Sequence, residues 1–270
     1  LSIITLCVSS IGLILNAALC IRVNLRKKKR KDAKITTQYT LGNMLTGVAY
    51  LIEEATKISS SCTFYHVTRL QCLHIHPQLT LLTFGEPMSS FAILIMAILF
   101  YTRRGEDLTA VSRAKRIALH IAPILAALFF ALTTWTYVTL QKQAAISSCC
   151  YVIAVWTKRY YRGYYILMSI AGYVSVALLI LGILKNTKSA EQRNTEYESR
   201  DKLEAVIVLC FATGLHATVQ CVAATYSKVG DITKLLLRHV WVIDALSFTF
   251  YPLYKIISDS CWKSTVERNA

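Results

Sequence analysis

The stretch Cys72–Thr102, CLHIHPQLTLLTFGEPMSSFAILIMAILFYT, decides the fold class of this chain. It is about 30 residues long and mostly apolar, and Glu86 is its one residue among Asp, Glu, Lys and Arg. At ~1.5 Å per residue, a helix of this length exceeds the ~30 Å hydrocarbon core of a bilayer. We therefore expect a membrane-spanning helix that is steeply tilted or protrudes, with Pro87 inside it.

Six further charge-poor stretches surround this one, and together they predict an all-α membrane protein. Hydrophobic residues make up 54% of the chain and charged residues 17%, against ~25% charged residues in soluble domains. This composition excludes the soluble, fibrous, disordered and nucleic-acid-binding classes. One seven-helix transmembrane bundle is expected over residues 1–270, with spans at 1–24, 37–58, 72–102, 117–140, 162–185, 203–226 and 235–257.

The basic residues give the bundle an orientation. Eight Lys and Arg lie within Arg22–Lys34, five within Arg103–Arg116, five within Lys185–Lys202 and three from Lys255 onward, so 21 of the chain's 30 lie on one side. Because cytoplasmic loops are enriched in Lys and Arg, this side is expected in the cytoplasm, with the N-terminus outside and the C-terminus inside. Leu1 already lies in an apolar stretch, so an outer N-terminal tail is expected to be missing.

Three ionisable residues lie at comparable depth in different spans: Glu86, His216 and Asp244. An ionisable side chain at mid-membrane costs at least ~2.5–3.5 kcal/mol, so such residues face the interior of a bundle. We expect a shared polar cavity that binds a ligand in the outer half of the bundle, with Gln220 and Trp241 along its wall. The alternative is a network of hydrogen bonds between helices that holds no ligand.

Several motifs resemble those of the rhodopsin-like G-protein-coupled receptors. The matching elements are Gly12-x-x-x-Asn16 in the first span, Ser90 and Leu94 in the third, and Tyr251-Pro252-Leu253-Tyr254 in the seventh. Seven spans, an outside N-terminus and a basic first internal loop fit the same family.

The chain also departs from the family's motifs at several positions, and these departures narrow the resemblance. Where an acidic-Arg-Tyr triplet would close the third helix, the chain has FYT at 100–102, followed by Arg103 and Arg104. The second span has no Asp at the family's sodium-site position, and the sixth has no Cys-Trp-x-Pro. Ala245 stands where an opsin carries its retinal-binding lysine, so an opsin is excluded. With a Gly-x-x-x-x-Ser pattern in the third span, the chain is most similar to nematode serpentine chemoreceptors such as the Srsx group.

The resemblance implies a chemoreceptor at the plasma membrane. Such a receptor would bind an extracellular small molecule or peptide and signal to a heterotrimeric G protein, without a cofactor. Coupling to the G protein would involve Tyr101 and Tyr254, and also Arg103 and Arg104 in place of the missing triplet arginine.

The cysteines carry two further predictions. As in the family, Cys72 is expected to form a disulfide with Cys149 or Cys150 on the oxidising outer side, where Cys62 can pair with the one left over. Cys261 follows the last span on the inner side, where palmitoylation would anchor a short surface helix. An unmodified cysteine at the membrane interface is the alternative.

Glu53 and Glu54 lie at the outer end of the second span. They would contact a cationic ligand or, alternatively, form a solvated helix end that pairs with Lys57. No metal site is expected, because the histidines of the first outer region lack the spacing of metal ligands. These histidines are His66, His74 and His76.

Enzyme motifs are absent from the sequence, and no catalytic activity is expected. The chain has no His-Glu-x-x-His, no Gly-x-Ser-x-Gly and no Gly-rich phosphate loop. The alternative function is a seven-span transporter or channel. Transport favours paired half-helices interrupted by Gly or Pro, whereas Pro87 interrupts one span without a counterpart in the other half, so a receptor is favoured.

The charge bias predicts the sidedness of both chain ends. With one epitope tag before Leu1 and another after Ala270, a membrane-impermeant antibody on intact cells should detect the first tag alone. Permeabilisation should expose the second tag, which controls for expression. Detection of the second tag on intact cells would contradict the orientation and favour a channel or transporter.

Overall fold

Long helices make up almost all of the regular structure. The computed structural model describes residues 2–25, 33–59, 66–102, 113–141, 145–147, 150, 155–190, 196–226 and 242–258. Its long helices are α1 (Ser2–Leu25), α2 (Ala33–Ser59), α4 (Pro77–Thr102), α5 (Arg113–Leu140), α7 (Thr157–Ala190), α8 (Glu196–Tyr226) and a helix at 242–258. The prediction of an all-α protein is confirmed.

Five of these helices are long and apolar enough to cross a membrane. The stretches that meet both criteria are Ser2–Leu25, Pro77–Thr102, Ile117–Leu140, Arg159–Lys185 and Glu204–Thr225. Such helices are expected of a membrane protein. That α2 and the helix at 242–258 also cross the bilayer, and that the N-terminus lies outside, stay predictions.

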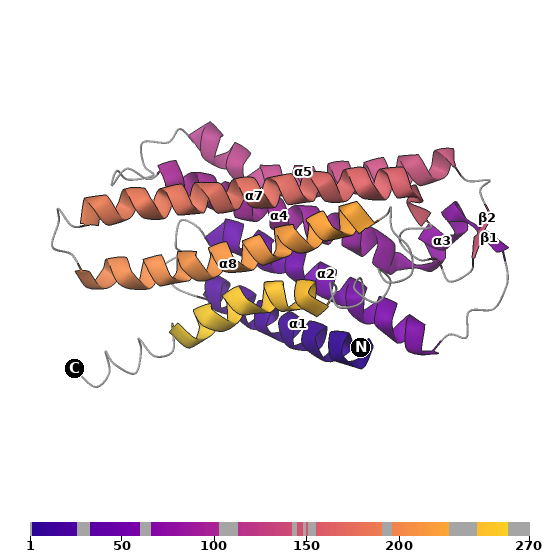
Figure 1. The fold of residues 1–270 in the computed structure, drawn as a ribbon, viewed down its shortest axis with the longest axis horizontal. Helices are drawn as coiled ribbons and strands as arrows, with labels where there is room; N and C mark the ends of the chain where they lie inside the picture. Colours follow the sequence, from indigo (N-terminus) through magenta and orange to yellow (C-terminus); the bar gives the residue numbers. More distant parts are fainter. Residues whose placement is uncertain are drawn as a thin grey trace.

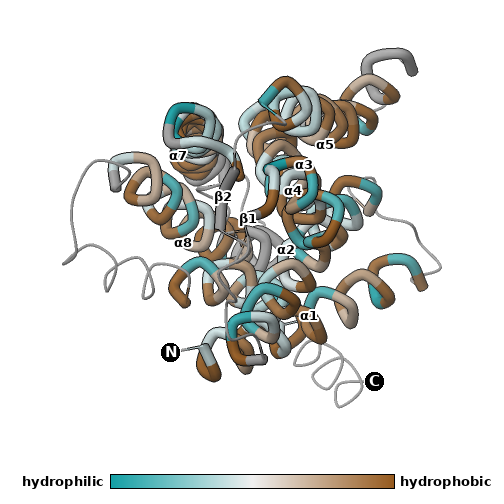
Figure 2. Tube along the Cα trace, turned by 90° about the vertical axis from the view of Figure 1, so that its right-hand side faces the viewer, coloured by the Kyte–Doolittle hydropathy of each residue, from teal (hydrophilic) through white to brown (hydrophobic). Residues whose placement is uncertain are grey.

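The helices lie side by side along the long axis of the molecule and form one bundle (Figure 1). α2 packs against α1 and α4, α4 also packs against α5 and α7, and α7 packs against α8. Large apolar side chains are exposed on the peripheral helices, for example Leu128 and Leu132 on α5 and Ile11 and Ile14 on α1. Hydrophobic stretches of both helices are visible in Figure 2. These faces suit the hydrocarbon of a bilayer better than water.

The third predicted span is not one long helix. The stretch 72–102 divides at His76 into α3 (Arg69–Ile75) and α4, which begins at Pro77. Proline disfavours helical backbone in the residue before it but is well suited to the first turn of a helix. His76 accordingly has φ −114° and ψ 81°. The expectation of a single helix over 72–102 is therefore wrong, whereas Pro87 does lie inside α4. That this span is tilted or protrudes stays a prediction.

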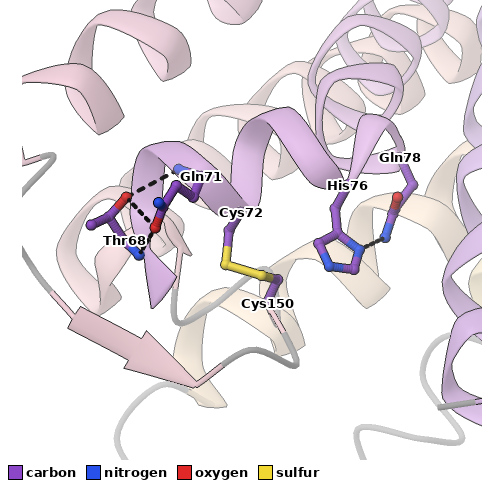
Figure 3. Close-up of a disulfide and its surroundings, with 6 residues drawn as sticks. All are labelled: Thr68, Gln71, Cys72, His76, Gln78 and Cys150. Atoms are coloured by element: carbon purple, nitrogen blue, oxygen red, sulfur yellow. Dashed lines mark hydrogen bonds between the residues drawn. A yellow bond between two sulfur atoms is a disulfide. The ribbon is translucent and has the colours of Figure 1, made fainter. Parts of the chain in front are cut away.

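A small cap covers one end of the bundle, which we call the cap end. It consists of β1 (His66–Thr68), paired antiparallel with β2 (Ala145–Ser147), and of α3. The start of α3 is stabilised by a capping box, in which the side chains of Thr68 and Gln71 each accept a hydrogen bond from the other's backbone N–H (Figure 3).

A disulfide closes the cap. Cys72 of α3 is bonded to Cys150, which lies shortly after β2 (Figure 3). This confirms one of the two predicted pairings, while Cys149 and Cys62 lie outside the described residues. The disulfide joins the start of the third predicted span to the chain between α5 and α7.

The backbones of α2 and α4 come into direct contact at two glycines. A Cβ atom on Gly42 would lie 2.7 Å from the backbone nitrogen of Ser89, and one on Gly85 would lie 2.6 Å from Oγ1 of Thr46 and 2.8 Å from the carbonyl oxygen of Gly42. Helices approach closely in membranes where small residues face each other. This contact sets the spacing at which α2 and α4 present their polar side chains.

A methyl group at the α2–α4 contact should lower stability. We expect Gly85→Ala to reduce the thermal midpoint of the purified chain by several degrees, because overpacking costs about 1–3 kcal/mol. Gly163→Ala on α7 is the matched control, since a Cβ there has no atom within 4 Å, and its midpoint should stay the same or rise. Equal midpoints for the two variants would show that the α2–α4 contact tolerates a side chain.

Candidate functional site

Two carboxyl groups from different helices are completely buried in the bundle. Glu86 of α4 and Asp244 of the helix at 242–258 are both 0% exposed. Each shares its helix face with other buried polar residues, Ser89 in the case of Glu86 and Ser247 in the case of Asp244. The buried Tyr50 of α2 faces both carboxyl groups.

Tyrosine hydroxyls connect these carboxyl groups. The hydroxyl of Tyr50 lies 2.6 Å from Oδ2 of Asp244 and 3.4 Å from Oε1 of Glu86. Because one hydroxyl has one proton, Tyr50 donates chiefly to the nearer Asp244. A second tyrosine, Tyr164 of α7, donates to Oε2 of Glu86 at 3.1 Å. The two acids thus receive their donors from α2 and α7.

An imidazole from α8 completes the cluster. Nδ1 of His216 lies 2.6 Å from Oδ1 of Asp244, and Nε2 of Gln220 lies 3.5 Å from Nε2 of His216. Oε1 of Gln220 is buried without a partner among the described residues. We call Tyr50, Glu86, Tyr164, His216 and Asp244 the polar cluster. It joins α2, α4, α7, α8 and the helix at 242–258.

A small cavity of about 20 Å³ adjoins the polar cluster, which is room for about one water molecule. Glu86 and His216 contribute to its wall. Thr46 also lines it, and Oγ1 of Thr46 is buried without a partner in the described part of the chain. The other lining residues are Tyr39, Asn43, Ser89, Ile93, Ala212, Thr213, Ser247 and Phe248.

A pair of asparagines continues the polar contacts beyond the cavity. Nδ2 of Asn43 donates to Oδ1 of Asn16 at 3.3 Å, and Nδ2 of Asn16 donates to the carbonyl oxygens of Gly12 and Phe248 at 2.8 and 3.0 Å. These bonds tie α1 and α2 to the helix at 242–258. Asn16 is the residue that resembles the family's helix-1 asparagine.

The structure brings together four of the five residues predicted to bind a ligand. Glu86, His216, Gln220 and Asp244 lie in or beside the polar cluster, and Trp241 is outside the described residues. Sequence reasoning did not include two members of the cluster. Tyr50 shares one helical face of the second span with the polar residues Asn43 and Thr46, whereas Tyr164 lies in a tyrosine-rich run that gives no distinct signal.

The tyrosines predicted to contact a G protein lie at the end of the bundle away from the cap, which we call the opposite end. Tyr254 donates its hydroxyl to Oε2 of Glu204 at 3.0 Å. Tyr101 is 37% exposed and has the amine of Lys185 over its ring. Arg103 and Arg104, which are also predicted to contact the G protein, and Cys261, the predicted lipidation site, lie outside the described residues.

At the cap end, the amine of Lys57 lies 2.9 Å from Oε1 of Glu53 and 2.7 Å from Oε1 of Glu54. Glu53 and Glu54 therefore form a helix end paired with Lys57, which was the alternative to contact with a cationic ligand.

The histidines of the cap region have neighbours other than a metal ion. The ring of His74 packs edge-on against Trp135, and Nδ1 of His76 lies 2.9 Å from Nε2 of Gln78 (Figure 3). Partial burial lowers the pKa of His76 below the ordinary value for imidazole.

No model of a known protein family matches the sequence, and no curated protein matches it.

Loss of the Tyr50 hydroxyl should weaken the polar cluster. We expect Tyr50→Phe to lower the free energy of unfolding by about 1–3 kcal/mol, because buried carboxyl oxygens lose their donor. Tyr173→Phe on α7 is the matched control, since the Tyr173 hydroxyl makes an exposed contact of 3.3 Å with Thr218, and its change should stay within ~0.5 kcal/mol. Thermal unfolding of the purified variants measures both. Equal effects would mean that the hydroxyl of Tyr50 contributes no more than a surface hydroxyl.

Proposed function

We propose that this chain is a seven-helix receptor of the plasma membrane, most similar to chemoreceptors. In this proposal it binds an extracellular small molecule or peptide and signals to a heterotrimeric G protein. The observation that carries the proposal is the polar cluster, which places two buried carboxyl groups and an imidazole between five helices. Ionisable side chains among membrane helices are costly and mark functional sites.

The cluster suits a receptor because each of its bonds joins different helices. The 2.6 Å contacts of Asp244 with Tyr50 and His216 connect the helix at 242–258 to α2 and α8. A ligand group that hydrogen-bonds to Asp244 would compete with these contacts. The ligand would then favour the arrangement of the helices in which Asp244 is free to bind the ligand. The population of receptor molecules would shift towards that arrangement.

The cap supports the same proposal. The Cys72–Cys150 disulfide and the β1–β2 pair hold the chain between α5 and α7 against the start of α3. A structured cap at the predicted extracellular end gives a ligand a defined surface to approach. The resemblance of Asn16 and of Tyr251-Pro252-Leu253-Tyr254 to family motifs adds to this support.

A transporter or channel is the second candidate function. Two carboxyl groups, an imidazole and a cavity with room for about one water molecule are also the groups that a proton or cation pathway uses. The two functions differ in what crosses the membrane, so one assay can separate them.

The test measures signalling and ion flux in the same cells. Cells that express the full chain and a promiscuous Gα reporter are exposed to a library of small polar and aromatic molecules. A receptor should give reporter signals without membrane currents. For any active compound, Asp244→Asn should raise the half-maximal concentration at least tenfold, which corresponds to about 1.4 kcal/mol of binding free energy.

The matched control for this change is Glu53→Gln. It also replaces a carboxyl by an amide, but at the paired end of α2, and it should change the half-maximal concentration less than about twofold, since its ion pair is partly exposed. Surface labelling of both variants verifies expression. Currents or pH changes without any reporter signal would contradict the receptor and support the transporter.

A further inference from the structure

Trp156 and Thr157 carry two unfavourable features side by side, at the cap end of the bundle where α7 begins (Figure 1). The indole of Trp156 is 0% exposed, and its Nε1 has no hydrogen-bond partner among the described residues. Thr157 has φ 55°, a left-handed conformation that β-branched residues rarely adopt. A buried donor without an acceptor and a strained backbone each cost free energy, and strained residues gather at functional sites.

The ring of Trp156 lies inside the bundle against a row of tyrosines on α7. Its closest aromatic neighbour is Tyr164, about two turns into the helix, with the ring centres 5.0 Å apart. Three more tyrosine rings lie at 5.9, 6.3 and 6.4 Å, those of Tyr160, Tyr161 and Tyr165. We call the space that the indole of Trp156 fills beside these tyrosines the indole site.

Other helices close the surroundings of the indole site. Trp156 belongs to the same cluster of buried apolar side chains as Leu79 of α4, Phe130 of α5 and Ala224 of α8. The walls of the site are therefore aromatic and aliphatic, which suits a flat apolar ring.

One side chain connects the indole site to the polar cluster. The ring of Tyr164 packs against Trp156 at an interplanar angle of 62°, while its hydroxyl donates to Oε2 of Glu86 at 3.1 Å. A change of occupant in the indole site therefore reaches Glu86 through Tyr164.

We infer that the indole site binds the ligand of this chain, that the ligand is a flat aromatic molecule of about the size of indole, and that Trp156 occupies the site until the ligand displaces it. The inference rests on the proposed function and names the class of its ligand. Because Nε1 of Trp156 has no acceptor among the described residues, a ligand without an N–H at that position avoids a desolvation cost that Trp156 bears. Displacement also releases the strain at Thr157.

A contact with α5 opposes this displacement. The hydroxyl of Tyr137 lies 2.5 Å from Oγ1 of Thr157, and the ring of Tyr137 stacks on that of Tyr160 at 4.7 Å. These two contacts hold the backbone at Thr157 and therefore keep the indole of Trp156 in the site.

Trp135 provides an internal comparison. It is partly buried at the cap end of α5, and its Nε1 donates to Oγ1 of Thr80 at 3.2 Å. Its indole has the acceptor that the indole of Trp156 lacks, so we expect Trp135 to stay in place when a ligand binds.

Fluorine NMR tests the displacement in the full chain in lipid nanodiscs. The four tryptophans of the chain are labelled as 5-fluorotryptophan, and Trp156→Phe and Trp135→Phe assign two of the resonances. The probe is benzothiophene, which has the shape of indole without its N–H. Benzothiophene should shift the Trp156 resonance in a saturable manner and leave the Trp135 resonance unchanged. At equal concentrations in the membrane, indole should bind about tenfold more weakly, because its N–H finds no acceptor.

Two variants change the competition by Trp156. Trp156→Ala removes the occupant, so benzothiophene should bind about tenfold or more tightly, since the vacant site is then always available. Tyr137→Phe keeps Trp156 but removes the bond to Thr157, and it should also tighten binding, which tests the inference even if Trp156→Ala does not fold. The matched control is Tyr173→Phe, whose hydroxyl makes an exposed contact with Thr218 and whose loss should leave binding unchanged.

Two results would overturn the inference. If benzothiophene binds to Trp156→Ala but does not shift the Trp156 resonance of the unchanged chain, the indole is a fixed part of the core. If benzothiophene shifts the resonances of Trp135 and Trp156 equally, it acts through the lipid and not at the indole site.

A reporter assay separates this inference from the proposed function. In cells with the promiscuous Gα reporter, benzothiophene and Trp156→Ala should each change the signal severalfold. A shift of the Trp156 resonance without either reporter change would support the indole site and contradict signalling to a G protein. Reporter responses to other compounds, with a Trp156 resonance that neither they nor benzothiophene shift, would overturn the indole site and leave the receptor proposal standing.

Discussion

The hydroxyl of Tyr50, which lies between the carboxyl groups of Glu86 and Asp244, is the interaction on which the bundle interior depends. Both carboxyl groups are shielded from bulk solvent, since both are 0% exposed. Burial of such groups is tolerated only when hydrogen bonds replace the lost water. Because the donors come from α2, α7 and α8, the helices must assemble in one arrangement for either acid to be accommodated.

The glycine contact makes this arrangement possible. Gly42 and Gly85 allow the backbones of α2 and α4 to touch, and the register of that contact brings Tyr50 of α2, two turns beyond Gly42, to Glu86, the residue after Gly85. Packing of small residues and hydrogen bonding are the two forces available to helices in lipid. In this chain, small-residue packing and hydrogen bonding both act between α2 and α4, at adjacent positions.

Much of this architecture follows from the sequence, and the exceptions have clear causes. Apolar stretches locate the helices, and counting residues places Glu86, His216 and Asp244 at a common depth. Counting does not give the rotation of one helix against another, so Tyr164 could not be assigned to the site. Counting residues also does not decide between two adjacent cysteines, and the structure pairs Cys72 with Cys150. Pro77 predicts the break at His76, because proline disfavours helical backbone in the residue before it. The hydrophobicity of the stretch alone does not predict this break.

The disulfide has a consequence for the order in which the protein matures. Cys72 and Cys150 are 78 residues apart, and α4 and α5 both lie between them. The bond cannot form until both helices and Cys150 have been synthesised and the two thiols have reached an oxidising compartment, since the cytosol keeps thiols reduced. The α2–α4 contact can therefore form before the Cys72–Cys150 bond, which then secures the cap on helices that are already in place.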